Sequence, residues 1–223
     1  MRLLAGVVAV FVLGLGAVAA GRVAGRIVIL EKDNKPSPDL GDAVLYLEGA
    51  ATSATLARPV TVEIAITDKV YAPHVVVVPV GSTVRFPNHD PFNHNVFSGS
   101  EANTFDLGLY GRGEVKSYTF EHPGLVRIYC NIHPRMVAYV LVMANRYYAQ
   151  PGNDGSFAIE NVAPGRYRLH VWHERIPSEV VKDVTAGAGG DVQIALNARG
   201  YRWQPHRNKH GRNYPTNAGR ERY

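Results

Sequence analysis

The chain has 223 residues, and 46% of them are hydrophobic, which is enough for one or two domains with hydrophobic cores and excludes a wholly disordered chain. Its formal net charge is +5, but seven basic residues and a single acidic one fall within residues 198–223, so the rest of the chain is close to neutral. The basicity therefore belongs to the C-terminal tail, and we expect no nucleic-acid partner.

The amino terminus has the pattern of an export signal. Arg2 precedes an apolar run through Leu15, and residues 17–20 form the small-residue pattern that an export peptidase cleaves. The run is short for a membrane span. We therefore expect residues 1–20 to be a cleaved signal peptide, with an uncleaved N-terminal anchor as the alternative, and the mature protein to be periplasmic or secreted.

Past this segment the sequence predicts an all-β chain. Val, Ile, Tyr and Thr recur in short alternating runs separated by Gly and Pro, and no long stretch has apolar residues at helical spacing. The first predicted strands lie at residues 26–30 and 43–49, with a turn-rich loop between them, and residues 50–57 have the composition of a linker. Residues 60–66 alternate, which predicts a strand with one buried face.

The next strands place a polar turn and a loop at one pole of a sandwich. The turn begins at residue 88 and runs into an apolar strand that ends near residue 97, and the loop spans residues 129–136. The other strands predicted in this part of the chain cover residues 75–78, 83–86, 114–120, 125–129 and 137–142.

The loop carries a thiolate, an imidazole and a thioether on Cys130, His133 and Met136. Mononuclear copper that alternates between its two oxidation states prefers two imidazoles and a thiolate in a trigonal plane, with a weak axial thioether. Cys130 is the only cysteine of the chain, so it forms no intrachain disulfide. In an oxidising compartment, metal ligation explains its presence better than packing does.

The second imidazole is expected from the segment that begins at residue 88. His94 enters the strand and is our candidate. His89 lies in the turn before Pro91 and is the alternative.

Taken together, these residues resemble the cupredoxins, the small blue copper proteins that include plastocyanin and amicyanin. The resemblance is carried by the Cys-x-x-His-x-x-Met loop, by His-Asn-Val at 94–96, by Pro-Val-Gly-Ser-Thr-Val at 79–84 and by Phe-Glu-His-Pro-Gly at 120–124. It implies a cupredoxin Greek-key β-sandwich over residues 58–143 with one type 1 copper ion. The implied metal ligands are His94, Cys130, His133 and Met136.

The resemblance also implies a role for Asn95. Its side chain is expected to tie the His94 segment to the backbone near Cys130 and thereby hold the ligands in place. The alternative is an ordinary turn-facing Asn.

Residues 144–197 predict a second, smaller sandwich. Two alternating strands lie within residues 153–173, with Asp-Gly before the first and Ala-Pro-Gly between them. This pattern resembles the second half of the prealbumin-like (transthyretin-like, carboxypeptidase-regulatory-like) β-sandwich domains. The opening strands of such a domain look present within residues 21–57, so we expect a split domain with the cupredoxin-like sandwich inserted. His170 and His173 point to opposite faces of their strand, which predicts structural or surface roles.

Residues 198–223 are predicted to be a basic disordered tail, because Arg, Asn, Gly and Pro surround His206 and His210. Aromatic residues, among them Trp203 and Tyr214, are interleaved with the charges. We expect the tail to attract an anionic partner, either an acidic redox protein or an anionic membrane surface. An inert extension is the alternative.

The function expected from these features is that of an exported type 1 copper protein that carries single electrons between redox partners. The resemblance leaves no open coordination position and no acid–base set, so we expect no enzyme. Partners are expected to dock at an exposed pole near His133. Arg135 there either favours an acidic partner or is an ordinary solvated charge. The alternatives are a periplasmic copper-binding carrier or sensor without electron-transfer turnover, and a structural or adhesion β-sandwich protein.

Overall fold

The computed structural model describes residues 21–32, 35, 37–49, 52, 57–187 and 189–215. Its regular elements there are β-strands and one 3-10 turn, η1 (Leu40–Asp42), which confirms the all-β class. The predicted signal peptide, most of the predicted linker and the end of the tail from residue 216 lie outside the described residues. No helix among the described residues has the length and apolar character needed to cross a membrane.

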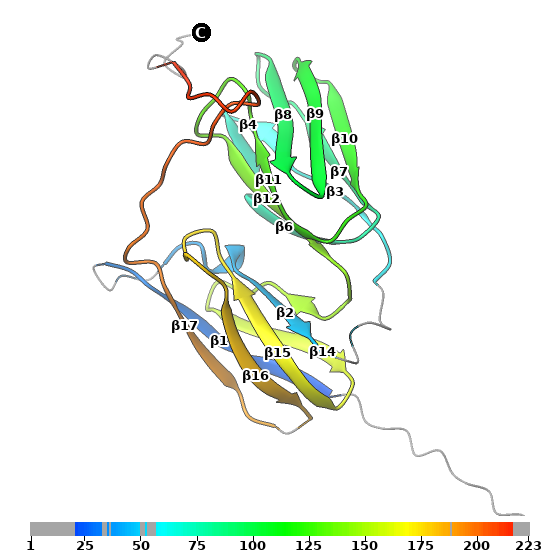
Figure 1. The fold of residues 1–223 in the computed structure, drawn as a ribbon, viewed down its shortest axis with the longest axis vertical. Coiled ribbons are helices and arrows are strands. Elements are labelled where there is room, and N and C mark those ends of the chain that lie inside the picture. The colour runs from blue at the N-terminus through cyan, green and yellow to red at the C-terminus, as the bar shows by residue number, and fades with distance from the viewer. Residues whose placement is uncertain are drawn as a thin grey trace, which may run out of the picture.

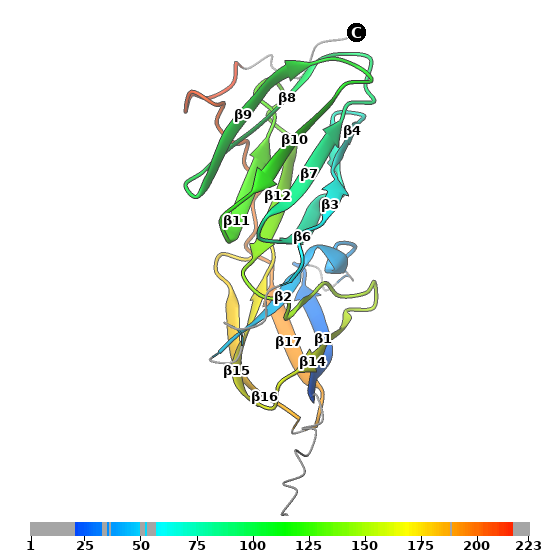
Figure 2. The same cartoon turned by 90° about the vertical axis from the view of Figure 1, so that its right-hand side faces the viewer.

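Residues 58–143 form one sandwich, which we call the inserted sandwich (Figures 1 and 2). A three-stranded sheet in the order β10-β7-β3 packs against a five-stranded sheet in the order β6-β12-β11-β8-β9, and β4 pairs with β5. The strands are β3 (Thr61–Glu63), β4 (Ala65–Thr67), β5 (Val70–Ala72), β6 (Val75–Pro79), β7 (Ser82–Pro87), β8 (His94–Ser100), β9 (Asn103–Tyr110), β10 (Val115–Phe120), β11 (Gly124–Tyr129) and β12 (Val137–Met143).

Alternation of buried and exposed side chains explains β11, the strand that leads to Cys130. Val126 and Ile128 are buried in the core of the inserted sandwich, and Arg127 between them is exposed. Burying two such aliphatic side chains stabilises the fold by about 1.5–3 kcal/mol each. The core therefore fixes the register of β11 and with it the position of the cysteine.

Strand β12 follows the loop at residues 129–136, which we call the ligand loop, and is buried along most of its length. It pairs in antiparallel fashion with β11 and in parallel with β6, so it lies inside the sheet. Its neighbours on both sides fix the two ends of the loop from residue 129 to residue 136. One face of β12 joins the core of the inserted sandwich, and the other joins a cluster between the two sandwiches that contains Leu141 and Met143.

The remaining strands form a second sandwich from two separate parts of the chain, which we call the split sandwich (Figure 1). Its sheets have the orders β14-β1-β17 and β13-β2-β15-β16. The strands before the inserted sandwich, β1 and β2, thus lie inside sheets built by strands that follow it, as the split arrangement requires. The strands are β1 (Gly21–Leu30), β2 (Val44–Glu48), β13 (Tyr148–Ala149), β14 (Ser156–Val162), β15 (Gly165–Trp172), β16 (Val180–Ala186) and β17 (Val192–Asn197).

A glycine in β1 allows the parallel pairing with β17. Gly25 lies opposite Val192, and a Cβ atom on Gly25 would lie 1.9 Å from the carbonyl oxygen of that valine. Only glycine fits at so close an approach of two backbones.

The two sandwiches meet through an apolar cluster and an ion pair. Trp172 of the split sandwich packs near Tyr139 of the inserted sandwich, with ring centroids 5.2 Å apart. Beside them, His74 Nε2 lies 2.9 Å from Glu174 Oε1. A buried apolar cluster and a partly exposed ion pair thus join the two sandwiches.

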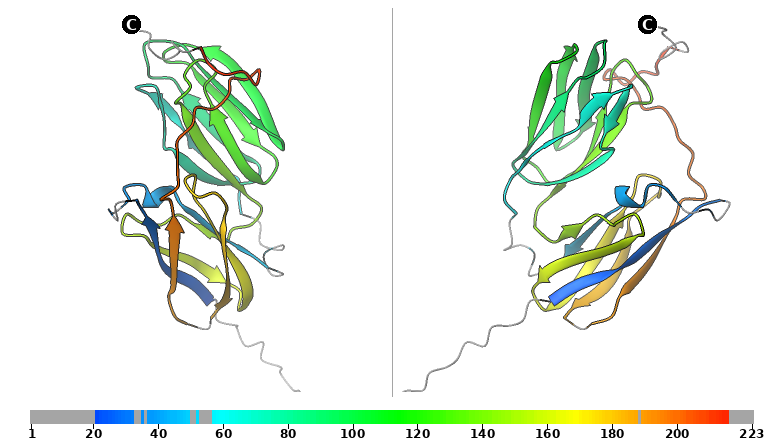
Figure 3. Two further views of the ribbon diagram at one scale, coloured as in Figure 1. Left: turned by 60° about the vertical axis from the view of Figure 1, so that its left-hand side comes forward. Right: turned by 180° about the vertical axis from the view of Figure 1, so that it is seen from behind.

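The chain after β17 leaves the split sandwich and runs along the molecule to the opposite pole of the inserted sandwich (Figures 1 and 3). Residues 198–215 contain no helix or strand, yet they make specific side-chain contacts with the inserted sandwich. This path differs from the disorder expected from composition.

Candidate metal centre

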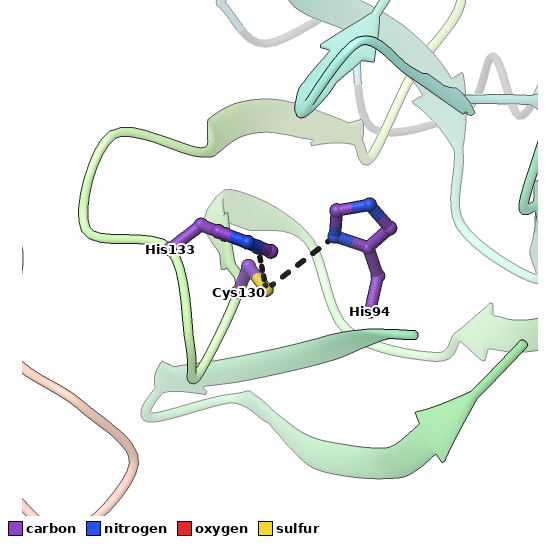
Figure 4. A group of neighbouring side chains, drawn as sticks. All are labelled: His94, Cys130 and His133. Carbon is purple, nitrogen blue, oxygen red and sulfur yellow. Dashed lines mark hydrogen bonds between the residues drawn. The ribbon is translucent and has the colours of Figure 1, made fainter. Parts of the chain in front are cut away.

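The fold brings together three donor side chains from distant parts of the sequence. His94 is the first residue of β8, Cys130 directly follows β11, and His133 lies on the loop before β12. The Nδ1 atoms of His94 and His133 lie 3.9 Å and 3.5 Å from Cys130 Sγ, and one donor atom from each of the three residues lies within 4.8 Å of the others. Figure 4 shows the two imidazoles directed at the sulfur.

These separations fit a metal ion at the centre of the three donors. With metal–sulfur bonds of about 2.3 Å, metal–nitrogen bonds of about 2.0 Å and bond angles of about 110–120°, the sulfur and nitrogen donors lie about 3.5–3.8 Å apart. The sulfur–nitrogen distance of 3.5 Å lies within this range, and the distance of 3.9 Å lies just above it. The side chains therefore have the spacing of ligands around one ion.

Met136, the fourth predicted ligand, is buried in the same core cluster as Cys130. The backbone N–H of Met136 donates to the His133 carbonyl at 3.1 Å, and the Cys130 N–H donates to the Met136 carbonyl at 3.4 Å. These hydrogen bonds close the ligand loop on itself. His89, the alternative imidazole, is exposed in the turn before β8 and is not part of the donor cluster.

Sequence reasoning missed Asp90, which contacts the first imidazole. His94 Nε2 lies 2.7 Å from Asp90 Oδ2, so the ring donates its Nε2 proton to the carboxylate and keeps a lone pair on Nδ1, which faces Cys130. The backbone amides of Asp68 and Lys69 donate to the two carboxylate oxygens. The position of Asp90, four residues before a candidate ligand, is the signal that would have found it.

Burial and hydrogen bonding have opposite effects on the pKa of Asp90. Burial raises the pKa, but hydrogen bonds from the amides of Lys69 and Asp68 and from His94 lower it, and the net pKa lies below the usual value. For His94, burial lowers the pKa and outweighs the opposing effect of Asp90. The geometry thus favours a neutral imidazole beside an ionised carboxylate, which is the protonation state of a metal ligand.

The Cys130 thiol is free and fully buried. Burial raises its pKa, and the backbone amides of Asn95, Ile132 and His133 oppose this effect. A bound cation deprotonates a coordinating thiol outright. The amides directed at the sulfur would then stabilise the thiolate.

Asn95 forms the hydrogen bond that was expected of it. The backbone N–H of Asn131, next to Cys130, donates to Asn95 Oδ1 at 3.2 Å. The Asn95 amide donates to Asp106 Oδ1 at 2.7 Å, and the buried Tyr71 hydroxyl donates to the Asn95 carbonyl at 2.7 Å. These bonds connect the strand of the first imidazole to the ligand loop.

Phe92 is a second residue that sequence reasoning missed. Its ring centroid lies 5.2 Å from that of His94 and 6.2 Å from that of His133. An aromatic ring beside both imidazoles lowers the local polarity of the donor cluster.

His170 and His173, for which structural or surface roles were predicted, lie in the split sandwich. His170 stacks on Tyr46 and contacts Glu48 and Glu179 at 2.8 Å and 3.1 Å. His173 is buried, with Nε2 3.3 Å from the Asp39 carbonyl oxygen. Neither belongs to the donor cluster.

Comparison with known proteins gives matches to parts of the chain. A family profile described as polysaccharide lyase family 4, domain II, matches residues 140–194, which include most of the later strands of the split sandwich. No curated protein matches the chain.

Several solved structures of copper proteins are similar to part of the chain. A purple cupredoxin from Nitrosopumilus maritimus has 28% identity and a TM-score of 0.33, covering 36% of this chain and 98% of that one. Amicyanin from Paracoccus versutus has 24% identity and a TM-score of 0.35, covering 37% and 81%. A copper-containing nitrite reductase from Thermus scotoductus has 25% identity and a TM-score of 0.35, covering 52% and 28%.

Proposed function

We propose that the protein carries single electrons on one copper ion, which His94, Cys130 and His133 would hold with Met136 as a weak fourth ligand. The observation that supports this most directly is the pair of Nδ1 atoms directed at one buried sulfur at 3.9 Å and 3.5 Å. Copper supplies a one-electron couple when bound, and a mixed set of imidazole, thiolate and thioether suits both of its oxidation states.

The surroundings of the donors support electron transfer rather than substrate chemistry. Asp90 accepts hydrogen bonds from Asp68, Lys69 and His94, so its carboxylate is held as a positioning group and is not available to move protons to a substrate. The buried, hydrogen-bonded donors favour one geometry in both oxidation states. We therefore propose a carrier and not an enzyme.

We propose that the protein is exported and that its partner is an acidic redox protein. Export fits the single cysteine, because an unpaired thiol in an oxidising compartment is explained by metal ligation. The pole of the inserted sandwich that holds the donor cluster, which we call the ligand pole, carries Arg135. The C-terminal segment adds exposed basic side chains there, including Arg207 and Arg212. Complementary charge raises the rate of association between redox proteins. Amino-terminal sequencing of the mature protein from its native host tests export, because a chain that begins at Met1 would contradict a cleaved signal.

Loading the protein with cupric ion tests the copper site. We expect an intense visible charge-transfer band from the thiolate and a narrow copper hyperfine splitting. The band should disappear in Cys130→Ser, because a hydroxyl supplies no thiolate. Met136→Leu should shift the band and the reduction potential, whereas the matched variant Met143→Leu, in the cluster between the sandwiches, should leave both unchanged.

Voltammetry of the loaded protein separates the proposal from its alternatives. Electron transfer requires a reversible one-electron wave. Exchangeable copper without such a wave would indicate a copper carrier or sensor. Protein that is isolated from its host without copper, and that stays colourless with cupric ion, would contradict both copper functions and favour a structural role.

A further inference from the structure

The described part of the C-terminal segment reaches the loop that carries two of the donors. We define residues 203–215 as the cap. It reaches the pole of the inserted sandwich that is farthest from the split sandwich (Figures 1 and 3). His133 is 6% exposed at this pole, although a partner was expected to find it on an open surface.

Two aromatic side chains of the cap pack on the ligand loop. The ring of His206 stacks on Tyr129, with centroids 4.2 Å apart and planes inclined by 17°. The Arg135 guanidinium lies 5.2 Å from the ring centroid of Trp203. Tyr129 and Arg135 lie at opposite ends of the ligand loop, so these contacts span it.

The cap also bonds directly to the backbone of a donor residue. The Tyr214 hydroxyl donates to the Cys130 carbonyl oxygen at 2.7 Å. The same hydroxyl lies 3.3 Å from His206 Nδ1, so two of the cap residues that contact the loop also contact each other. The Cys130 carbonyl is therefore held by a residue 84 positions along the chain.

Lys209 connects the cap to the ligand loop directly and to the strand of His94 through Asp106 of β9. Its backbone N–H donates to Asn131 Oδ1 at 3.0 Å, and its ammonium lies 2.6 Å from Asp106 Oδ2. Asp106 accepts a hydrogen bond from Asn95, and Asn95 in turn accepts one from the Asn131 amide. The interactions form a closed ring, so opening the ligand loop breaks several of them together.

The cap has a defined local structure that presents these side chains on one side. The Asn208 N–H donates to the Arg212 carbonyl at 2.9 Å, the Gly211 N–H donates to the Asn208 carbonyl at 2.8 Å, and Gly211 has a φ of 73°. This tight turn reverses the chain between His206 and Tyr214 and brings both against the loop.

We propose that the cap is a closing device for the metal centre: it holds the ligand loop in place, with Tyr214 as the principal positioning residue, and limits metal release and solute access to Cys130. Release of the ion from this site requires the loop to open. The frequency of opening depends on the free energy of that local transition, to which each contact of the cap contributes. The metal part of this inference rests on the proposed copper function, whereas closure of the loop does not.

The first test needs no metal. The rate of alkylation of Cys130 by iodoacetamide is measured in the metal-free, full-length protein. Tyr214→Phe removes the hydrogen bond to the Cys130 carbonyl and should raise the rate about 2- to 10-fold. His206→Ala should also raise it, and His206→Phe, which retains a ring over Tyr129, should restore slow alkylation. The matched control is His210→Ala, since His210 is exposed in the same segment.

The second test measures the release of cuprous ion from the loaded protein to bathocuproine disulfonate. The same variants should accelerate release in the same order while the thermal unfolding temperature stays at the wild-type value. Alkylation and release at wild-type rates in Tyr214→Phe would overturn the proposal. So would an acceleration that only follows a loss of global stability.

The two tests separate the cap from the copper function. Faster alkylation in Tyr214→Phe, in a protein that never forms a coloured copper centre, supports the cap and contradicts the copper function. A coloured centre whose copper release and thiol alkylation are unchanged in the variants supports the copper function and overturns the cap.

Discussion

Asp90 Oδ2 lies 2.7 Å from His94 Nε2 in a buried environment, and this contact directs the opposite nitrogen of the ring toward Cys130 Sγ. A carboxylate in this position fixes the tautomer and the orientation of the imidazole and increases its basicity. The donor cluster thus depends on a residue that is not itself a ligand.

The first prediction concerns this carboxylate. Asp90→Ala should weaken cupric ion binding about 10- to 100-fold, because the imidazole loses its orienting acceptor. Asp90→Asn keeps an acceptor but removes a negative charge that stabilises the more positive ion, so the reduction potential should rise. Competition titration and voltammetry measure the two effects. The control is Asp68→Asn, which removes an exposed charge nearby and leaves the backbone bond to Asp90 in place. Equal potentials for Asp90→Asn and wild type would contradict the role of Asp90.

The second prediction concerns the split sandwich. Gly25→Ala should lower the free energy of unfolding by at least about 2 kcal/mol, because the new Cβ forces β1 away from β17. The matched control is Gly99→Ala in β8, where no heavy atom lies within 4 Å of the added Cβ. Denaturant unfolding monitored by circular dichroism measures both. If Gly25→Ala is as stable as Gly99→Ala, the parallel pairing is not part of the fold in solution.

The third prediction concerns pH and the contact between the sandwiches. At His74, burial lowers the pKa, but Glu174 and Asp42 raise it by a larger amount. The net pKa therefore lies above its ordinary 6.5. At Glu174, burial raises the pKa, but His74, Tyr139 and His173 together lower it by more, so the net pKa lies below 4.5. The His74 contribution to stability is complete below pH 6.5 and is lost as pH rises through its raised pKa. The Glu174 contribution is complete above pH 4.5 and is lost as pH falls through its lowered pKa.

The ion pair should therefore stabilise the protein most between about pH 4.5 and 6.5. The measurement is the difference in unfolding free energy between wild type and His74→Gln across a series of pH values. This difference should be largest in that window and should decrease toward pH 9. His122→Gln replaces an exposed histidine of the inserted sandwich and serves as the control. A difference for His74→Gln that does not vary with pH would contradict the prediction.

The fourth prediction concerns the charge of the ligand pole. The reduced protein should react faster with ferricyanide, an anionic oxidant, when Arg207 and Arg212 are present than in the Arg207→Gln/Arg212→Gln variant. The advantage should disappear with salt, because the Debye length falls from about 10 Å at 0.1 M to about 3 Å at 1 M. Arg166→Gln, an exposed change in the split sandwich, is the control. Salt-independent rates that are equal in all variants would remove the basic segment from the mechanism.

The sequence alone was sufficient for the all-β class and for the donor types of the loop. Short runs of Val, Ile and Tyr predicted β11 and β12. Short spacing placed Cys130 and His133 on one loop, because neighbours in sequence are neighbours in space whatever the fold. The position of His94 at the start of a strand also distinguished it from the exposed His89.

Only the tertiary structure decided that Asp90 and the C-terminal segment meet the site. Composition suggested a disordered tail, since residues 198–215 have too few apolar side chains for a core of their own. The composition of a segment does not predict the contacts that it makes with another part of the protein. Here His206 stacks on Tyr129, and the Cys130 carbonyl accepts a hydrogen bond from Tyr214. Such contacts depend on strand pairings between residues far apart in the chain, and local spacing carries no information about those pairings.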